Sequence, residues 1–453
     1  MKARTIDMTQ GPMARPLLRF ILPMIGSSIF QQLYNTVDFM FVGNLMDSTA
    51  AAAVGASSTL ITCTIGLFSG ISVGTSVVAA QAIGAKDTGR AEKALHSSVL
   101  FGAFGGILVA LLGMLFAPGI LRLLRTPESV IPQAVTYLRI YILSVPMLVF
   151  YNMVSGGMRT YGDTRTPFLL LVICGFMNVA MDALFIIVIP LGVAGVSIAT
   201  CITQSLSAVL VGVAASRPGR PLRLSARKLH MDWGVLKSVL AIGLPTGAQT
   251  ILITFSNVMV QYHINAFGET AVAAFATYYK VESLIYLPIV AFGQAATTFA
   301  GQNTGAKQFR RLRRGTVGIA AVAAVAVAII AGVILLFPRT VFTWFMKDQD
   351  VVTVALQVAM ISFPLYWIYP ILEVFGGSVR GMGHALCSMA IIVLCLCALR
   401  VGLLAVFSRT VNTIESIAAV YPITWAVTAV SFVIAFFVLL RRKLLANPGE
   451  AAS

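Results

Sequence analysis

Four carboxylic acids lie inside long apolar stretches of this sequence. They are Asp38, Asp182, Glu282 and Glu373, whereas the other twelve of the sixteen acids fall between those stretches or at their ends. A charged side chain at the centre of a membrane costs about 2.5–3.5 kcal/mol on insertion scales, so such residues usually face a polar interior and have a function. These four acids are therefore the first candidates for the chemistry of the chain.

Two of the four acids, Asp38 and Asp182, are expected to lie at one depth with two neutral oxygen-bearing side chains. Asn178 precedes Asp182 by four residues and shares its helix face, and counting turns from the helix ends places Thr200 at the same depth. Carboxylate, amide and hydroxyl oxygens suit a hard cation such as Na⁺, and two neighbouring carboxylates also hold a proton readily. The sequence predicts a cation-coupling site, which is a metal site only if the ion is Na⁺, and it leaves Na⁺ and H⁺ open.

Further polar residues inside apolar stretches are candidates for a substrate cavity. Glu373 and its repeat counterpart Asn152 lie deep in their helices, and Glu373 is expected to act as a lone acid that attracts a cationic substrate. Lys280 and Glu282 are two residues apart and do not face each other on a helix, so each needs another partner. The candidates for the cavity are Tyr34, Asn152, Lys280, Glu282 and Glu373.

The elements that position these residues must be membrane helices. The chain of 453 residues is 58% hydrophobic and 11% charged, with a mean hydropathy of +0.90, whereas soluble domains carry about 25% charged residues. This composition excludes a soluble enzyme, a disordered protein and a disulfide scaffold. The six cysteines and four histidines have no metal-ligand spacing, and no cofactor and no cleavable signal peptide are expected.

Apolar stretches long enough to cross a membrane repeat along the whole chain. They predict an all-α integral membrane protein of about twelve spans with short connections. The expected spans are 16–42, 51–80, 93–117, 132–157, 166–189, 192–215, 234–266, 270–301, 314–337, 351–378, 385–408 and 414–440.

Basic residues indicate how these spans are oriented. The termini and the loops after even-numbered spans hold 24 of the 32 Lys and Arg residues, the loops on the other side hold five, and three lie within spans. Since cytoplasmic loops accumulate Lys and Arg, both termini are expected in the cytoplasm and the protein in the inner (cytoplasmic) membrane. Topology thus accounts for most of the net charge of +16 without a nucleic-acid partner.

The two halves of the sequence are related by a repeat. Leu22-Pro23 matches Leu244-Pro245 at an offset of 222, and the segments 81–86 and 302–307 match at an offset of 221. We therefore expect two pseudo-symmetric six-helix lobes, 1–216 and 233–453, joined by a basic linker, 217–232. An even number of spans per half makes the repeat parallel, an architecture that places substrate between the lobes. Pro23 and Pro245 interrupt helical hydrogen bonding at equivalent places and are candidate hinges.

This pattern resembles the multidrug and toxic compound extrusion (MATE) family over residues 13–440. The resemblance rests on Leu22-Pro23 with Asn35-Thr36-Val37-Asp38, Gly84-Ala85-Lys86, Gly305-Ala306-Lys307, Arg159-Thr160-Tyr161-Gly162-Asp163, Asn178 with Asp182, and Arg380-Gly381-Met382-Gly383. It implies twelve helices in two lobes around a cavity, and export of organic cations or amphipathic drugs against inward Na⁺ or H⁺ flow, without an enzymatic step. A monomer in the lipid bilayer is expected.

The resemblance also implies roles for particular residues. Asp38, Asn178, Asp182 and Thr200 correspond to the N-lobe cation site of prokaryotic members, and Pro23 to the proline at which the first helix bends when that site is occupied. The norfloxacin-exporting branch keeps an acid in span seven, where residues 251–256 contain none, and an acid in span ten near Tyr369. Coupling is therefore expected through the N-lobe.

Three other functions remain as alternatives. A lipid-linked oligosaccharide flippase of the same superfamily would need extra spans and an arginine-rich cavity, whereas only Arg139 and Arg400 lie within spans here. An intramembrane enzyme would need a catalytic constellation that the sequence does not display. A channel is less compatible with duplicated lobes, which favour alternating access.

Overall fold

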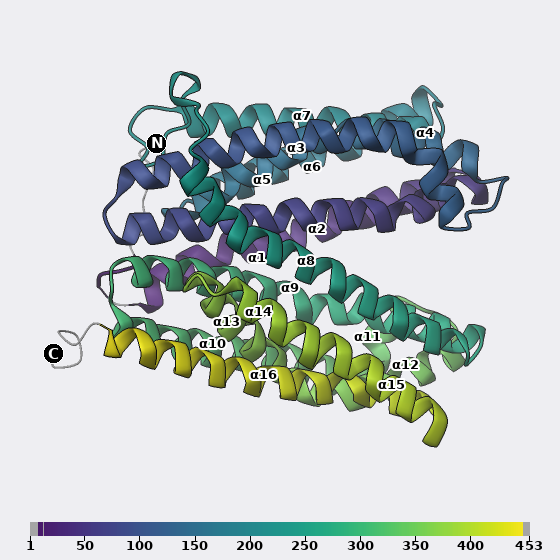
Figure 1. Cartoon of the computed structure of the whole chain (residues 1–453). Coiled ribbons are helices and arrows are strands. Elements are labelled where there is room, and N and C mark those ends of the chain that lie inside the picture. The colour runs from purple at the N-terminus through teal and green to yellow at the C-terminus, as the bar shows by residue number, and fades with distance from the viewer. Residues whose placement is uncertain (1–7, 12, 447–453) are drawn as a thin grey trace. The chain divides into compact units, whose positions relative to one another are not determined.

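The computed structural model describes residues 8–11 and 13–446, which are helical with short connections and contain no strand. The helices are α1 (Ala14–Leu45), α2 (Ser48–Gly84), α3 (Thr88–Leu123), α4 (Ile131–Ile142), α5 (Val145–Thr160), α6 (Arg165–Ala183), α7 (Val193–Ser216), α8 (Trp233–Asn265), α9 (Glu269–Gly305), α10 (Phe309–Leu336), α11 (Pro338–Thr343), α12 (Gln349–Ser362), α13 (Ile368–Gly381), α14 (Ala385–Ile391), α15 (Leu399–Thr410) and α16 (Ile414–Leu445) (Figure 1).

The predicted membrane spans are confirmed. Within the described residues, nine helices are long and apolar enough to cross a membrane, and two bent pairs, α4 with α5 and α12 with α13, raise this number to eleven. The remaining long helix is α1 with 32 residues, which is less apolar because it carries Gln31, Gln32 and Asp38. Together these elements give the expected all-α membrane protein.

The bends and irregular turns within spans are features that helical periodicity did not predict. The fourth span bends by 42° between α4 and α5, and the tenth by 54° between α12 and α13. A proline lies close to each break. Pro146 is in the first turn of α5, and Pro364 is in the short 3₁₀ turn Phe363–Leu365 that follows α12. Neither proline has an N–H to donate, so each interrupts the helical hydrogen bonds. Two π-helical segments, Leu184–Val188 and Ile392–Ala398, lie in spans five and eleven.

Residue contacts divide the chain into two compact units. The first unit contains Leu18–Gly247, and the second contains Met8–Leu17 and the described residues from Ala248 onward. The division falls inside α1 and α8, near Pro23 and Pro245. The linker 217–232 and the first half of α8 therefore belong to the first unit.

Both units contain the same close helix crossing, in which a glycine of one helix lies against another. A Cβ on Gly156 of α5 would lie 2.6 Å from the Ser72 Oγ of α2, and a Cβ on Gly377 of α13 would lie 2.5 Å from the Gly293 carbonyl oxygen of α9. The two glycines are 221 residues apart, as are Ser72 and Gly293. The repeat seen in the sequence is thus also a repeat of packing.

The turn between α5 and α6 explains one of the sequence motifs. Gly162 has φ +89° and Gly383 has φ +92° at the equivalent turn, a region that glycine adopts without strain. Asp163 lies just before α6 and supports its first turn, because its Oδ1 accepts a hydrogen bond from the Thr166 N–H at 3.0 Å. Its Oδ2 forms an ion pair of 2.8 Å with Arg220, which ties the linker to this turn.

The residues just before α1 and α8 are both anchored by hydrogen bonds. In the second unit, Arg311 donates to the carbonyl oxygens of Met8, Gln10 and Gly11 at 2.9–3.1 Å. In the first unit, Asp232 accepts a hydrogen bond from the Val235 N–H and forms an ion pair of 3.1 Å with Lys93. That backbone bond, followed by Lys93, lowers the pKa of Asp232.

Candidate ion site and substrate site

Three of the four residues predicted to bind a cation contact neighbouring helices of the first unit, and the fourth, Thr200, lies on one of those helices. Asp38 on α1 and Asp182 on α6 lie within hydrogen-bonding reach of each other. Asn178 lies one turn before Asp182, and its Nδ2 donates to the Thr203 Oγ1 of α7 at 3.4 Å. Thr200 lies one turn before Thr203 on α7. We refer to Asp38, Asn178, Asp182, Thr200 and Thr203 as the oxygen cluster.

Most acceptor oxygens of the oxygen cluster are buried without a donor. Asp182 and Asn178 are 0% and 2% exposed. No hydrogen-bond donor in the described part of the chain reaches Asp38 Oδ1, either carboxylate oxygen of Asp182, or Asn178 Oδ1. A buried ionised carboxylate without a partner is strongly unfavourable. The cluster therefore needs a positive charge that these residues do not provide.

Three tyrosines interact electrostatically with the acids of the oxygen cluster. Tyr34 of α1 and Tyr137 of α4 interact with both Asp38 and Asp182, and Tyr141, one turn after Tyr137, interacts with Asp38. The candidate Tyr34 thus belongs beside the cation site. Sequence reasoning missed Tyr137, Tyr141 and Thr203. Their spacing could have indicated them, because Tyr137 and Tyr141 are four residues apart on one helix face and Thr203 follows Thr200 by three residues on another.

An irregular backbone accompanies the oxygen cluster on α6. The π-helical segment begins at Leu184, two residues after Asp182. Single π-helical turns are frequent at functional sites because the inserted residue re-aims the neighbouring side chains. No group of three or more His, Cys, Asp or Glu side chains suited to a metal occurs in residues 8–11 and 13–446. The ligand set present, carboxylate, amide and hydroxyl oxygen, fits Na⁺ or a proton rather than a transition metal.

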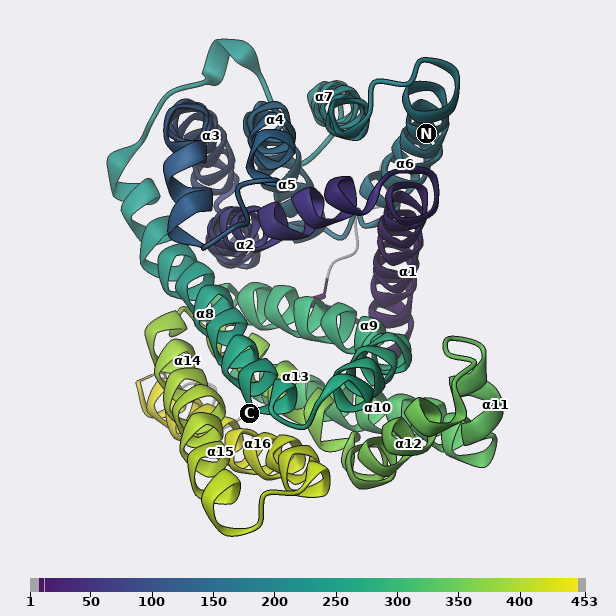
Figure 2. The ribbon, with the colours of Figure 1, turned by 90° about the vertical axis from the view of Figure 1, so that its right-hand side faces the viewer.

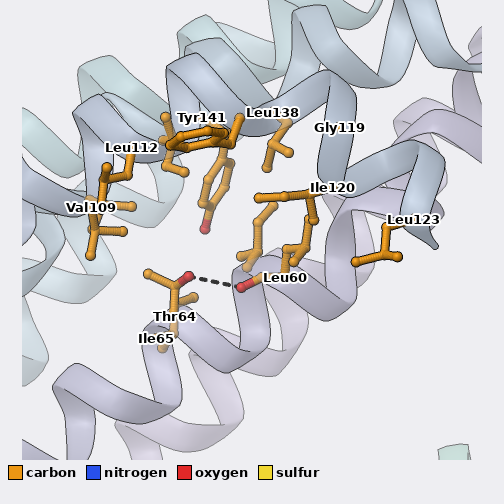
Figure 3. Close-up of a pocket in the computed structure, with 15 residues that line it drawn as sticks. Leu60, Thr64, Ile65, Val109, Leu112, Gly119, Ile120, Leu123, Leu138 and Tyr141 are labelled. Carbon is orange, nitrogen blue, oxygen red and sulfur yellow. Dashed lines mark hydrogen bonds between the residues drawn. The ribbon is translucent and has the colours of Figure 1, made fainter.

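An apolar cavity of about 410 Å³ lies between α2, α3 and α4 of the first unit. Figure 3 shows the Tyr141 ring pointing into it, and the only other polar lining side chain is Thr64. The hydroxyl of Thr64 already donates to the Leu60 carbonyl oxygen at 2.9 Å. The cavity thus offers no ligand set for an ion and is separate in chemistry from the oxygen cluster.

Glu282 lies in a cluster of aromatic side chains in the second unit. Its Oε1 accepts a hydrogen bond of 2.9 Å from the Tyr366 hydroxyl. The Tyr366 ring packs on Trp425 with ring centroids 4.7 Å apart, and Tyr369 packs on the same indole at 5.3 Å. The Glu282 carboxylate is half-buried and can attract a cation, whereas the Tyr366 and Trp425 rings are each 1% exposed and pack on one another. Lys280, two residues earlier, is exposed, in agreement with the prediction that the two do not face each other.

Glu373 is not the lone acid that the sequence indicated. Its Oε1 forms an ion pair of 2.9 Å with Arg380 of the same helix. The two residues are seven apart, almost two helical turns, so they share a face and the long arginine reaches back. The prediction that Glu373 offers an unpaired charge to a substrate is therefore wrong.

The remaining candidates have local roles in the structure. The Asn152 side chain donates to the Leu148 carbonyl oxygen of its own helix at 2.9 Å, and the backbone carbonyl oxygen of Asn152 accepts from the Ser72 hydroxyl of α2 at 2.7 Å. Pro23 and Pro245 lie inside the continuous helices α1 and α8. The side chain of Asn35 lies outside the described part of the structure.

Known proteins resemble this chain over nearly its whole length. The probable multidrug resistance protein YoeA of Bacillus subtilis (strain 168) is 28% identical over 426 residues, 91% of each chain. A MOP superfamily transporter from Pyrococcus furiosus superposes with a TM-score of 0.91 at 21% identity, over 98% of this chain and 99% of that one. Figure 2 shows α3, α4 and α7 of the present chain nearly end-on. A MATE in complex with MaL6 gives a TM-score of 0.92 at 20% identity, over 97% and 99%.

The comparison with family models decides the assignment. The MatE model matches this chain twice, over residues 23–184 and 245–406. The matched segments begin at Pro23 and Pro245, the equivalent prolines of the internal repeat, and together cover well over half of the chain. This protein therefore belongs to the MatE family of membrane transporters.

Proposed function

We propose that this transporter exports organic cations and amphipathic drugs in exchange for Na⁺ or H⁺. The observation that supports ion coupling is the pair of facing acids, Asp38 and Asp182, whose buried oxygens lack donors. Either ion would supply the missing positive charge. The similarity to a probable multidrug resistance protein supports the class of substrate.

The proposed cycle is a competitive exchange by alternating access. With the transporter open to the outside, Na⁺ or H⁺ enters the oxygen cluster and draws Asp38 on α1 toward Asp182 on α6. Because Pro23 lacks the N–H that would bond to the backbone of the preceding turn, α1 can change its bend there. This change favours release of substrate outside. The return to the inward-facing state releases the ion to the cytoplasm, where both termini lie.

Glu282 is the proposed contact for the positive charge of the substrate. Its carboxylate lies against Tyr366, within reach of a ring system that includes Trp425. A half-buried carboxylate bordered by packed aromatic side chains attracts positive charge on an apolar body without demanding one shape. The ion site and the substrate site would then lie in different units of the chain.

Transport in proteoliposomes tests this function. Purified protein should move a fluorescent organic cation when either a Na⁺ or an H⁺ gradient is imposed separately, and the effective gradient identifies the ion. Asp38→Asn removes the charge with almost no change in volume and should abolish the gradient-driven component. Unimpaired ion-driven export by Asp38→Asn would refute the proposal.

A further inference from the structure

Arg400 of the second unit occupies the place that corresponds to the oxygen cluster of the first. Spans six and twelve align at an offset of 221, so Thr200 corresponds to Tyr421 and Thr203 to Thr424. The structure repeats this register: Thr203 donates to the carbonyl oxygens of residues 199 and 200, and Thr424 to those of 420 and 421. At the same offset Arg400 corresponds to residue 179, next to Asn178.

The Arg400 guanidinium joins three spans of the second unit that are the repeat equivalents of the spans carrying the oxygen cluster in the first unit. Its Nη1 donates to the Asn257 Oδ1 of α8 at 3.0 Å, and its Cζ lies 4.9 Å from the centre of the Tyr421 ring on α16. Arg400 itself lies in the first turn of α15, the part of span eleven that follows the π-helical segment. Spans seven, eleven and twelve are thus connected through one cation, as spans one, five and six meet at Asp38, Asp182 and Thr200.

The charge at this place is reversed relative to the first unit. Val260 corresponds to Asp38 at the offset of 222, and Leu403 corresponds to Asp182 at 221. Both carboxylates are therefore replaced by aliphatic side chains, and a cationic side chain is added. A π-helical segment adjoins the charge in both units, but on opposite sides of it: one begins two residues after Asp182, and the other ends two residues before Arg400.

Burial of Arg400 is too costly to serve packing alone. The side chain is 4% exposed, its Nε has no hydrogen-bond partner among the described residues, and none of the five ion pairs found there includes it. Its interaction with Glu282 is electrostatic over a longer range. Apolar residues can often take the place of buried charged groups without loss of stability. A buried arginine with so few partners therefore points to a function other than stability.

We propose that Arg400 is a built-in cation that substitutes in the second unit for the ion bound by the first. It holds Asn257 and Tyr421 together permanently, so the ion-dependent rearrangement is confined to α1, α6 and α7. Arg400 is thus a positioning residue. Throughout the cycle it keeps α8, α15 and α16 in the arrangement that α1, α6 and α7 adopt only when the ion is bound. This inference rests on the proposed ion coupling through the oxygen cluster.

Three substitutions separate the charge of Arg400 from its hydrogen bond. Arg400→Lys keeps the charge, Arg400→Gln keeps an N–H donor for Asn257 without charge, and Arg400→Ala removes both. Arg139→Ala is the matched control, because Arg139 also lies within a span but is exposed and donates to the Met114 carbonyl oxygen. The assay is counterflow exchange of a fluorescent organic cation in proteoliposomes without an ion gradient.

A built-in cation predicts a definite order of activities. Arg400→Lys should retain most of the exchange, whereas Arg400→Gln and Arg400→Ala should lose about tenfold or more, because neither supplies the buried cation that faces the Tyr421 ring. Millimolar guanidinium chloride should restore Arg400→Ala saturably, and NaCl of equal ionic strength should not. Arg139→Ala should behave as the wild type under all conditions.

Other results would overturn the proposal. They are exchange by Arg400→Gln at the wild-type rate, Arg400→Lys as inactive as Arg400→Ala, or no response of Arg400→Ala to guanidinium. If Arg400→Ala is unstable, its melting temperature should rise in millimolar guanidinium while that of the wild type does not, and equal responses also count against the proposal. The assay needs no ion gradient, so a failure of ion coupling in the wild type would be seen separately in gradient-driven transport.

Discussion

The oxygen cluster of the first unit and the surroundings of Arg400 in the second occupy equivalent spans but carry opposite charge. Asp38 and Asp182 face each other with unpartnered oxygens, whereas Arg400 is placed between a carboxamide and an aromatic ring. The bonding of Thr203 and Thr424 to their own helices is unchanged between the two. The difference shows that the duplication preserves packing while single side chains set the charge of each unit, and from it we propose that only the first unit takes up an ion.

The largest expected effect comes from Asp182→Asn. This acid is 0% exposed and neither of its oxygens has a donor, so the neutral amide removes the charge that attracts the ion. We expect a loss of gradient-driven export of about a hundredfold or more, as for other residues whose charge is needed in a buried site. Initial rates in proteoliposomes measure this loss.

Asp47→Asn is the matched control for that substitution. Asp47 accepts a hydrogen bond from the Ala50 N–H at the start of α2 and lies outside the oxygen cluster. This variant should leave gradient-driven export within about twofold of wild type, because the Asn amide oxygen can still accept the Ala50 hydrogen bond and caps the helix as well as Asp. Equal losses for Asp47→Asn and Asp182→Asn would remove the distinction between the two acids.

Glu282→Gln should weaken substrate binding in the second unit while leaving ion binding intact. The amide can still accept the Tyr366 hydrogen bond but no longer attracts a cation. We expect the dissociation constant of an organic cation to rise about tenfold, equivalent to roughly 1.4 kcal/mol. Fluorescence anisotropy measures it, with Glu415→Gln, an exposed acid of α16, as the control. Unchanged affinity would place the substrate charge elsewhere.

The glycines at the repeated helix crossing should differ between the two units in how much a substitution costs in stability. Gly377→Ala should destabilise the protein by about 1–3 kcal/mol, because its Cβ would press on the Gly293 backbone oxygen, which cannot move aside. Gly156→Ala should cost less, because its Cβ meets two serine side chains. Melting temperatures in detergent report both. Gly332→Ala, which has open space around it, is the control, and an equal drop in all three variants would contradict this packing argument.

The smallest effect is expected from Arg311→Ala, which weakens the attachment of the segment Met8–Gly11 before α1, while Met8 keeps its hydrogen bonds to Gln302 and Asn303. Three hydrogen bonds to backbone carbonyl oxygens are lost, but the oxygen cluster is untouched. Amide hydrogen exchange should accelerate in this segment, and transport should fall by less than about threefold, since each such bond contributes about 1 kcal/mol. Exposed Arg314 provides the control as Arg314→Ala. Protection equal to wild type would show that the segment is held by other contacts.

Sequence reasoning located the spans and the oxygen cluster because both follow from local rules. Asn178 and Asp182 are four residues apart on one helix, and depth counting added Asp38 and Thr200. The pairing of Glu373 with Arg380 was missed because an arginine seven residues further along the same helix was not considered as a partner. The bend beside Pro146 and the two π-helical segments depend on how neighbouring helices pack, which helical periodicity does not encode.

The central claim, that the ion binds in the first unit and not in the second, is tested most directly by equilibrium binding to purified protein. Radioactive sodium and proton uptake in unbuffered micelles would be measured for wild type, Asp38→Asn with Asp182→Asn, and Glu282→Gln. We predict that one of the two ions binds to wild type and to Glu282→Gln, and that the Asp38/Asp182 double variant binds neither. Undiminished ion binding by the double variant, with loss in Glu282→Gln, would contradict the account.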